Sequence, residues 1–308
     1  MITVFTATHN RAKRIKQLYE SLLVQTCFDF EWVVVDDGST DDTEKFFEEI
    51  RAKKNNFRVI YSKQKHGGKH RAINKGLDLA NGEYFFMVDS DDVLFPDAIE
   101  LIERWVGTIA GNKSFAGVSG LLLYRGEKRQ DAQEEKYVDA TNFEREKYGL
   151  LGDKAEVYRT DLLRKHKFPE FDGELFVTED VCYQEIANEG YKIRWFNEPV
   201  CVYEYLDDGL TKNGANDIKG HVESFGGFCY WVKRALKVKP FYNRHSIIKA
   251  YEEACRTKKI NFSKRARILE KNLCSYLVLV YLESWFSLGW HAILKIVWAI
   301  RRKFVSTL

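Results

Sequence analysis

The sequence predicts an α/β fold in which a mostly parallel, Rossmann-like sheet lies between helices and is followed by a helical C-terminal extension. Three observations lead to this prediction. Short apolar segments alternate with amphipathic ones over residues 1–125. The apolar segments are hydrophobic at consecutive positions, which is typical of strands covered on both faces. From about residue 217 onward, the pattern is helical to the end of the chain.

The expected elements follow in order along the chain. The predicted strands are 2–7, 32–35, 58–61, 84–88 and 115–124, and the helices between them are 11–25, 41–53, 69–80 and one opened by Pro96. Helix 11–25 places Ile15, Leu18 and Leu22 on one face. Residues 126–155 are polar and irregular, and a helix over 179–189 with strands 192–196 and 200–205 comes after them.

Polar clusters follow three of the predicted strands. They are Thr8-His9-Asn10-Arg11, Asp36-Asp37 and Asp89-Ser90-Asp91-Asp92. Ligands of open α/β sheets bind beyond the carboxyl ends of the strands. We therefore expect the three clusters to meet in one cleft.

The carboxylates of these clusters suggest a chemistry. Asp89 and Asp91 are hard oxygen ligands that suit Mg²⁺ or Mn²⁺, which can also hold a diphosphate. The alternative is a solvated acidic turn before the next helix. Asp36 and Asp37 can accept from a nucleobase or a ribose hydroxyl, although a turn with helix-capping residues is an alternative and compatible interpretation.

The order and spacing of several motifs closely resemble glycosyltransferase family 2, the inverting enzymes with the GT-A fold. The motifs are Thr8-His9-Asn10-Arg11, Val35-Asp36-Asp37-Gly38-Ser39-Thr40-Asp41, Asn74-Lys75-Gly76 with Asn81-Gly82-Glu83-Tyr84, and Asp89-Ser90-Asp91-Asp92. The resemblance is strong over residues 1–125 and looser to about residue 213. It implies a nucleotide-sugar donor.

The resemblance implies roles for individual residues. The implied donor-binding residues are Thr8, Asn10, Arg11, Asp36, Asp37, Lys69, Asp89 and Ser90, and the implied metal ligands are Asp89 and Asp91. Thr8 and Asp37 match positions that hold the base, and Lys69 matches one that approaches the diphosphate. For Lys69, a solvated lysine at a helix start is an equally weighted alternative.

The pair Glu179-Asp180 matches the family's carboxylates before a helix, which makes Asp180 the implied catalytic base. An inverting transfer needs one carboxylate to accept the proton of the acceptor hydroxyl. The alternative is that both residues only stabilise the helix N-terminus electrostatically. Residues 205–211 resemble the late loop that closes over the donor, but they hold no histidine that could be a further metal ligand.

The C-terminal part differs from the rest in charge and hydrophobicity. Residues 230–308 hold 17 Lys/Arg and 4 Asp/Glu, whereas residues 1–229 hold 31 and 41. Residues 276–300 are strongly apolar, but a polar residue recurs every fourth position from Glu283 to Lys295. We expect an in-plane element on an anionic membrane surface or, equally, a helix packed on the body or on a second subunit. A membrane span ranks third.

The leading functional hypothesis is an inverting, hexosyltransferase-type enzyme that uses a UDP-sugar in cell-surface polysaccharide or glycolipid synthesis, with a saccharide or lipid-linked acceptor. The alternatives are a sugar nucleotidyltransferase and a catalytically inactive nucleotide-sugar-binding protein. No nucleic acid is expected as a partner, because no base-reading module accompanies the basic tail.

The remaining predictions concern domains and location. The predicted domains are a catalytic domain over 1–215, divided at residue 125 into donor and acceptor parts, and a helical extension over 216–308. None of the six cysteines forms a CxxC pair, and the chain opens into an apolar strand without a signal core. We therefore expect a cytoplasmic protein, with peripheral attachment at the inner face of the cell membrane as a further option.

Overall fold

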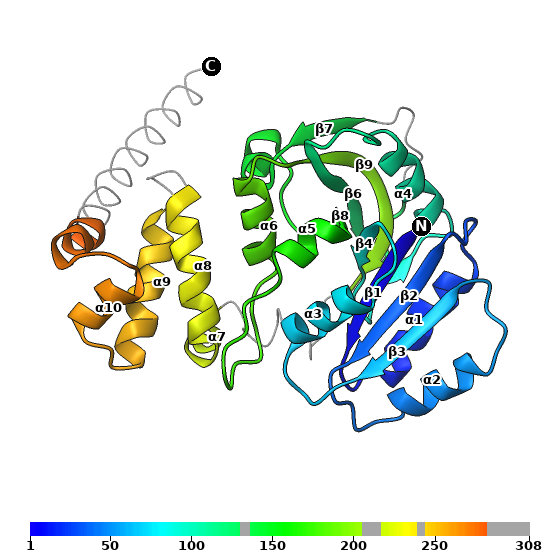
Figure 1. Ribbon diagram of the computed structural model, residues 1–308, viewed down its shortest axis with the longest axis horizontal. Helices are drawn as coiled ribbons and strands as arrows, with labels where there is room; N and C mark the ends of the chain where they lie inside the picture. The colour runs from blue at the N-terminus through cyan, green and yellow to red at the C-terminus, as the bar shows by residue number, and fades with distance from the viewer. Residues whose placement is uncertain (130–135, 205–216, 239–243, 282–308) are drawn as a thin grey trace, which may run out of the picture. The chain divides into compact units, whose positions relative to one another are not determined.

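The computed structural model describes residues 1–129, 136–204, 217–238 and 244–281 (Figure 1). The chain divides into two compact units, residues 1–213 and 214–308. This division by contacts lies close to the predicted boundary at residue 215, while the functional division at residue 125 stays a prediction.

One sheet forms the centre of the first unit, with helices on both faces (Figure 1). Its strands in the described residues are β1 (Ile2–Thr8), β2 (Phe30–Asp36), β3 (Arg58–Lys63), β4 (Tyr84–Met87), β5 (Val93–Leu94), β6 (Phe115–Tyr124), β7 (Tyr137–Ala140), β8 (Lys154–Arg159) and β9 (Lys192–Tyr203). The strand order is β3-β2-β1-β4-β8-β6-β9-β5, and β7 pairs with β9.

The helices of this unit connect or flank the strands. They are α1 (Ala12–Leu23), α2 (Thr43–Arg51), α3 (Lys69–Leu79), α4 (Ala98–Gly107), the 3₁₀ helix η1 (Asn142–Tyr148), α5 (Thr160–Lys165) and α6 (Asp180–Asn188). The predicted fold class is therefore confirmed: a sheet between helices, with further helices toward the C-terminus.

The parallel half of the sheet aligns the strand ends that carry the polar clusters. Strands β3, β2, β1 and β4 are all parallel, and Thr8 at the end of β1 lies opposite Asp36 at the end of β2. Strand β2 is buried along its whole length, as expected for a strand covered on both faces. Both clusters therefore leave the sheet at the same edge.

The second half of the sheet is more mixed than the sequence predicted. Strand β8 runs antiparallel between β4 and β6, and β7 and β5 run antiparallel to β9. Residues 126–155, expected to be irregular, contain β7 and η1, because polar edge strands lack the apolar run that signals a buried strand. The two strands expected at 192–196 and 200–205 form the single strand β9, which pairs with β6 through register shifts near Pro199.

One aromatic pair packs α4 against this half of the sheet. The rings of Trp105 and Phe196 stack with their centroids 4.5 Å apart, and neither side chain is appreciably exposed. Trp105 also lies against Gly120 of β6, where an added Cβ would come within 2.9 Å of the indole ring. The helix and the sheet are thus fitted closely together at this point.

The second unit is helical. It contains α7 (Ile218–Glu223), α8 (Phe225–Val238), α9 (Arg244–Thr257) and α10 (Phe262–Ile268), and residues 273–281 are also helical. Its own apolar core encloses a charged group, Glu252, which pairs with Arg265 at 2.7 Å and accepts from the Tyr276 hydroxyl. A buried carboxylate needs such partners because desolvation of an unpaired charge is costly.

No helix within the described part of the chain is long and apolar enough to cross a membrane. Most of the segment 276–300, for which the sequence leaves membrane attachment, packing or a span open, lies outside the described residues.

Truncation of Trp105 tests the packing of α4. We expect Trp105→Ala to lower the free energy of unfolding by about 3–5 kcal/mol, because it removes a buried aromatic side chain and leaves a cavity against Phe196. Chemical denaturation followed by circular dichroism measures this. Val24→Ala, at a side chain that is 59% exposed, is the matched control and should change stability by less than about 0.5 kcal/mol. Equal effects of the two substitutions would contradict the packing described.

Candidate active site

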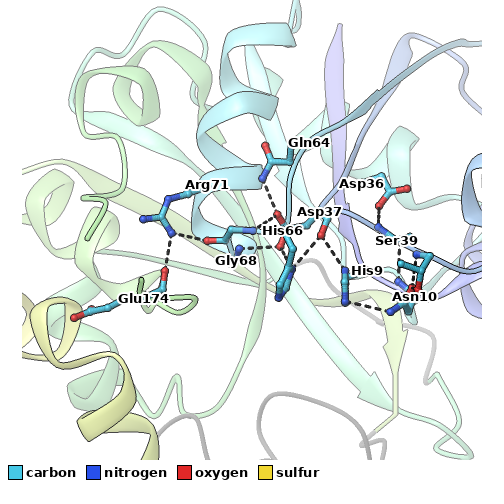
Figure 2. Close-up of polar contacts among 12 residues, drawn as sticks. His9, Asn10, Asp36, Asp37, Ser39, Gln64, His66, Gly68, Arg71 and Glu174 are labelled. Atoms are coloured by element: carbon cyan, nitrogen blue, oxygen red, sulfur yellow. Dashed lines mark hydrogen bonds and ion pairs between the residues drawn. The ribbon is translucent and has the colours of Figure 1, made fainter. Parts of the chain in front are cut away.

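The buried carboxylate of Asp37 organises the edge of the sheet beyond β2 (Figure 2). Its Oδ1 accepts from Gln64 Nε2 at 2.8 Å and from the backbone N–H of Gly67 at 2.9 Å. Its Oδ2 accepts from His66 Nδ1 and from the backbone N–H of Gly68, both at 2.8 Å. Each oxygen therefore receives two donors, and the carboxylate fixes the loop 64–68 that leads into α3.

The turn after β1 is joined to the turn after β2. The backbone N–H of Asp37 donates to Thr8 O at 2.8 Å, and His9 Nδ1 donates to Asp37 O at 2.9 Å. Asn10 has a φ of 54° and accepts from the backbone N–H of Thr40 at 2.8 Å. Asparagine tolerates this left-handed conformation better than most residues. Thr8 Oγ1 is buried and has no hydrogen-bond partner among the described residues.

The carboxylates of Asp36 and Asp41 stabilise the turn that follows β2. Asp36 accepts from the backbone N–H of Ser39 at 2.7 Å and from the Tyr61 hydroxyl at 2.6 Å. Asp41 accepts from the backbone N–H of Ala12 at 3.0 Å and of Thr43 at 3.1 Å, at the starts of α1 and α2. The turn interpretation considered for this motif thus holds for these two carboxylates, whereas Asp37 faces the loop before α3.

Lys69, the first residue of α3, connects two carboxylates from distant parts of the chain. Its Nζ lies 2.7 Å from Asp89 Oδ1 and 2.9 Å from Glu179 Oε1. Burial by itself would lower the pKa of Lys69, but the two carboxylates outweigh burial and raise it above its usual value. Lys69 is therefore paired with two carboxylates and is not the freely solvated lysine of the alternative interpretation.

The segment after β4 concentrates negative charge. Burial, and then the charge of Asp89, raise the pKa of Asp91, while Arg11 and Lys69 act in the opposite direction. Burial together with Asp89 and Asp91 raises the pKa of Asp92 to about 8. Burial is the larger cause of both shifts, and the repulsion between neighbouring carboxylates adds to it.

A divalent cation fits this donor set by its chemistry. Asp89 and Asp91 supply hard oxygen ligands, and a cation would oppose both burial and the charge of Asp89, which together raise the pKa of Asp91. Within the part of the chain that the structure describes, no group of three His, Cys, Asp or Glu side chains is arranged to hold a metal. Water and the oxygens of a bound diphosphate are further ligands of the kind that such a cation takes.

Asp180 lies at the start of α6, next to Glu179, and its side chain is exposed. Behind it lies Glu156 of β8, a buried carboxylate 3.3 Å from Arg145 Nη1. Burial raises the pKa of Glu156 to about 8 against the opposing effect of Arg145, and the charges of Asp180 and Glu179 add to the rise. An exposed carboxylate beside a buried one is an arrangement that can accept a proton from a docked hydroxyl group.

The structure brings together most of the residues that the sequence singled out. Asp37 contacts Gly68, and the next residue in the chain, Lys69, contacts Asp89 and Glu179. Asp180 directly follows Glu179 in the sequence. Ser90 is buried between Asp89 and Asp91. The loop 205–211 lies outside the described residues.

Four further residues take part in this arrangement: Gln64, His66, Arg71 and Glu156. The sequence analysis did not assign them to the site. A hydrogen-bonding side chain in a loop or on a polar strand carries no periodic signal, so only the three-dimensional contacts reveal them.

Comparisons with known proteins identify the family of the donor half. The protein-family model described as "Glycosyl transferase family 2" matches residues 3–110. This part of the chain is a glycosyltransferase family 2 region. The matched region includes Thr8, Asp37, Lys69, Asp89 and Asp91, whose roles stay predictions.

Two relatives illustrate the extent of similarity. The chain is 41% identical to a chondroitin synthase of Escherichia coli over 101 residues, which are 33% of this chain and 14% of that protein. It is 31% identical to the putative glycosyltransferase EpsH of Bacillus subtilis (strain 168) over 188 residues, 58% of this chain and 53% of that protein. The chain thus spans about half or less of the length of these curated relatives.

Solved glycosyltransferase structures share the fold. Residues 1–349 of S. aureus TarS in complex with UDP-GlcNAc superpose with a TM-score of 0.57 at 20% identity, covering 94% of this chain and 92% of that one. The mannosyltransferase PcManGT from Pyrobaculum calidifontis, in complex with GDP-Man and Mn²⁺, gives 0.53 at 17% identity, covering 92% and 82%. At these identities the likeness establishes the GT-A fold alone.

Asparagine at position 37 tests the organising role of Asp37. An amide in place of the carboxylate turns an N–H₂ group toward buried donors, so we expect Asp37→Asn to lower the free energy of unfolding by about 1–3 kcal/mol. Chemical denaturation gives the value. Asp42→Asn makes the same change at an exposed side chain and should be nearly neutral. A stable Asp37→Asn variant would show that the loop 64–68 does not depend on this carboxylate.

Proposed function

We propose that this protein is an inverting glycosyltransferase that moves a sugar from a nucleoside diphosphate sugar to a saccharide or lipid-linked acceptor. One observation carries the proposal. The Lys69 ammonium lies between Asp89, which follows a buried strand, and Glu179, which precedes Asp180. We propose that Asp89 acts on the donor side and the pair 179–180 on the acceptor side, and the family 2 match of residues 3–110 supports this assignment.

The donor is proposed to be a UDP-sugar. Related structures hold UDP or UDP-GlcNAc, although another holds GDP-Man. The base would lie near Thr8 and Asp37, where the unpartnered Thr8 Oγ1 offers a hydrogen bond. The backbone donors of Gly67 and Gly68 keep Asp37 in place, while the side chains of Gln64 and His66 can rotate to let the base reach a carboxylate oxygen.

The diphosphate is proposed to lie between the positive charges of Lys69 and Arg11 and the carboxylates of Asp89 and Asp91. Asn10 and Asp36 shape the turn beside it, and Ser90 lies between the two metal-binding positions. A bound Mg²⁺ or Mn²⁺ at Asp89 and Asp91 would neutralise the charge that develops on the leaving diphosphate. Lys69 can add a further positive charge there.

Asp180 is proposed to be the catalytic base. It accepts the proton of the acceptor hydroxyl while that oxygen forms a bond to the anomeric carbon. The bond from the anomeric carbon to the diphosphate oxygen breaks on the opposite face, and its electron pair leaves with the nucleoside diphosphate. Its exposed position at the start of α6 makes Asp180 accessible to an incoming acceptor.

The pathway is proposed from the products that relatives are named for. Two of them are a chondroitin synthase of Escherichia coli and a hyaluronan synthase of Pasteurella multocida. Synthesis of a surface polysaccharide or glycolipid therefore fits best. A sugar nucleotidyltransferase is less consistent, because the turn Thr8–Arg11 has none of the glycines that such enzymes use around a triphosphate. An inactive binding protein is disfavoured because every candidate carboxylate is present.

The place of action is proposed to be the cytoplasmic face of the membrane. The described turns at 273–281 expose Leu273, Leu277, Val278 and Tyr281, which lie along one side of a helix. The excess of Lys and Arg after residue 230 suits anionic lipid headgroups. An apolar helix face in a basic unit thus matches an anionic membrane surface.

Two substitutions separate donor binding from chemistry. We expect Asp91→Asn to lose the Mn²⁺-dependent rise in melting temperature that a UDP-sugar causes in the wild-type protein, because a metal ligand is removed. We expect Asp180→Asn to keep that rise but to lower the transfer rate by about 10²–10⁴-fold, because the base is removed. Thermal unfolding with a panel of nucleotide sugars, followed by transfer assays with the ligand that binds, measures both.

Asp172→Asn is the control, since Asp172 is an exposed carboxylate of the segment before Asp180. It should leave binding and transfer unchanged. Wild-type transfer by Asp180→Asn would reject the proposed base. Release of diphosphate from a nucleoside triphosphate and a sugar phosphate would instead identify a nucleotidyltransferase.

Membrane attachment is tested by flotation of the full chain with vesicles of phosphatidylglycerol and of phosphatidylcholine. We expect binding to the anionic vesicles only, and a loss of about tenfold or more in the double variant Leu277→Glu/Val278→Glu, because two apolar side chains no longer enter the lipid. Leu23→Glu/Val24→Glu, at exposed apolar positions of the first unit, should bind as wild type. Equal flotation of both double variants would exclude the 273–281 face.

A further inference from the structure

The segment that carries Asp180 has little regular structure of its own. Residues 166–179, between α5 and α6, contain no helix or strand. We call residues 168–179 the base-carrying segment. Its position must therefore be set by contacts with other parts of the first unit, and the strongest of these come from α3.

Arg71, one turn into α3, binds three backbone carbonyls at once. Its Nη1 donates to Gly67 O and to Glu174 O, and its Nη2 donates to Phe171 O, all at 2.6 Å. Phe171 and Glu174 belong to the base-carrying segment, and Gly67 belongs to the loop that Asp37 holds. Figure 2 shows the contact of Arg71 with Glu174. A planar guanidinium with several donors suits this geometry, whereas an ammonium does not.

Close packing supports the same junction. Gly68 has a φ of +97°, and a Cβ added there would lie 1.9 Å from Leu175 O. Only glycine allows the loop to approach the segment this closely. The loop and the segment therefore touch through their backbones, without an intervening side chain that could absorb movement.

Two further side chains of α3 complete the attachment. Asn74 exchanges two hydrogen bonds of 2.9 Å with the backbone of Phe168. Lys69 reaches Glu179 at the other end of the segment. Side chains from the first two turns of α3 thus hold the base-carrying segment at its start, middle and end.

We propose that Arg71 is a positioning residue that couples occupancy of the donor site to the placement of Asp180. A nucleotide that binds at Asp37 and Lys69 contacts the loop 64–68, and Arg71 transmits the resulting constraint to residues 171–174. The donor would thereby fix the base before the acceptor reacts. This inference rests on the function proposed above and extends it to regulation of the same site.

Hydrogen exchange measured by mass spectrometry on the full chain tests the proposal, with and without UDP and Mn²⁺. We expect UDP to increase protection of residues 168–179 in the wild-type protein. In Arg71→Lys we expect this segment to exchange faster in the free protein and to gain no protection from UDP, because an ammonium cannot join the three carbonyls. UDP affinity should change by less than about threefold, while kcat for transfer falls by about tenfold or more at saturating substrates.

Arg164→Lys is the matched control. Arg164 also binds carbonyls of α3, donating to Leu77 O at 2.9 Å and Ala80 O at 2.6 Å, but at the other end of the helix. It should leave protection of residues 168–179 and kcat as in the wild type. This comparison separates a role at the segment from a general loss of helix stability.

The outcomes distinguish this inference from the function on which it rests. If UDP protects residues 168–179 equally in wild type and Arg71→Lys, the coupling is overturned although nucleotide binding stands. If the wild-type protein binds no nucleotide, the donor site is rejected and the coupling with it. Faster exchange of this segment in free Arg71→Lys, but not in Arg164→Lys, would then still support the attachment of the segment by Arg71.

Discussion

The first unit depends on one constraint: the carboxylates at the ends of its parallel strands need positive charge close to them. Asp89, Asp91 and Asp92 follow one strand directly, and Glu179 joins them from a distant segment. Such a group is stable only where cations are close, because partly buried carboxylates repel one another. Lys69 meets this need within the protein itself. The start of α3 must therefore lie at this edge, and the contacts of Asp37 with the preceding loop hold it there.

Much of this arrangement could be predicted from local patterns in the sequence. The apolar runs ending at Asp36 and Asp89 indicate buried parallel strands, and parallel strands bring their carboxyl ends to one edge. The proximity of Asp37, Lys69 and Asp89 follows from that rule together with the glycines before α3. Where strands are polar or antiparallel, as in residues 126–159, the same rule gives no signal, and β7 and Glu156 were not predicted.

Arg71 shows a second limit of prediction from sequence. Two of its acceptors are backbone carbonyls about a hundred residues away, and a carbonyl is present at every position of every chain. The residue types at Phe171 and Glu174 therefore give no indication that their carbonyls bind Arg71. The identity of such a side chain becomes informative only when the path of the segment is known. Side-chain pairs such as Lys69 and Asp89 differ, because opposite charges restrict the possible partners.

The two units bury separate sets of apolar side chains, one drawn from residues 2–201 and the other from residues 228–276. Among the described residues, every contact attributed to the candidate site falls between Thr8 and Glu179. Within the described part of the chain, a substitution in the helical unit therefore replaces no side chain of the candidate site. Evolution can thus vary the apolar core of one unit while the carboxylates of the other stay the same.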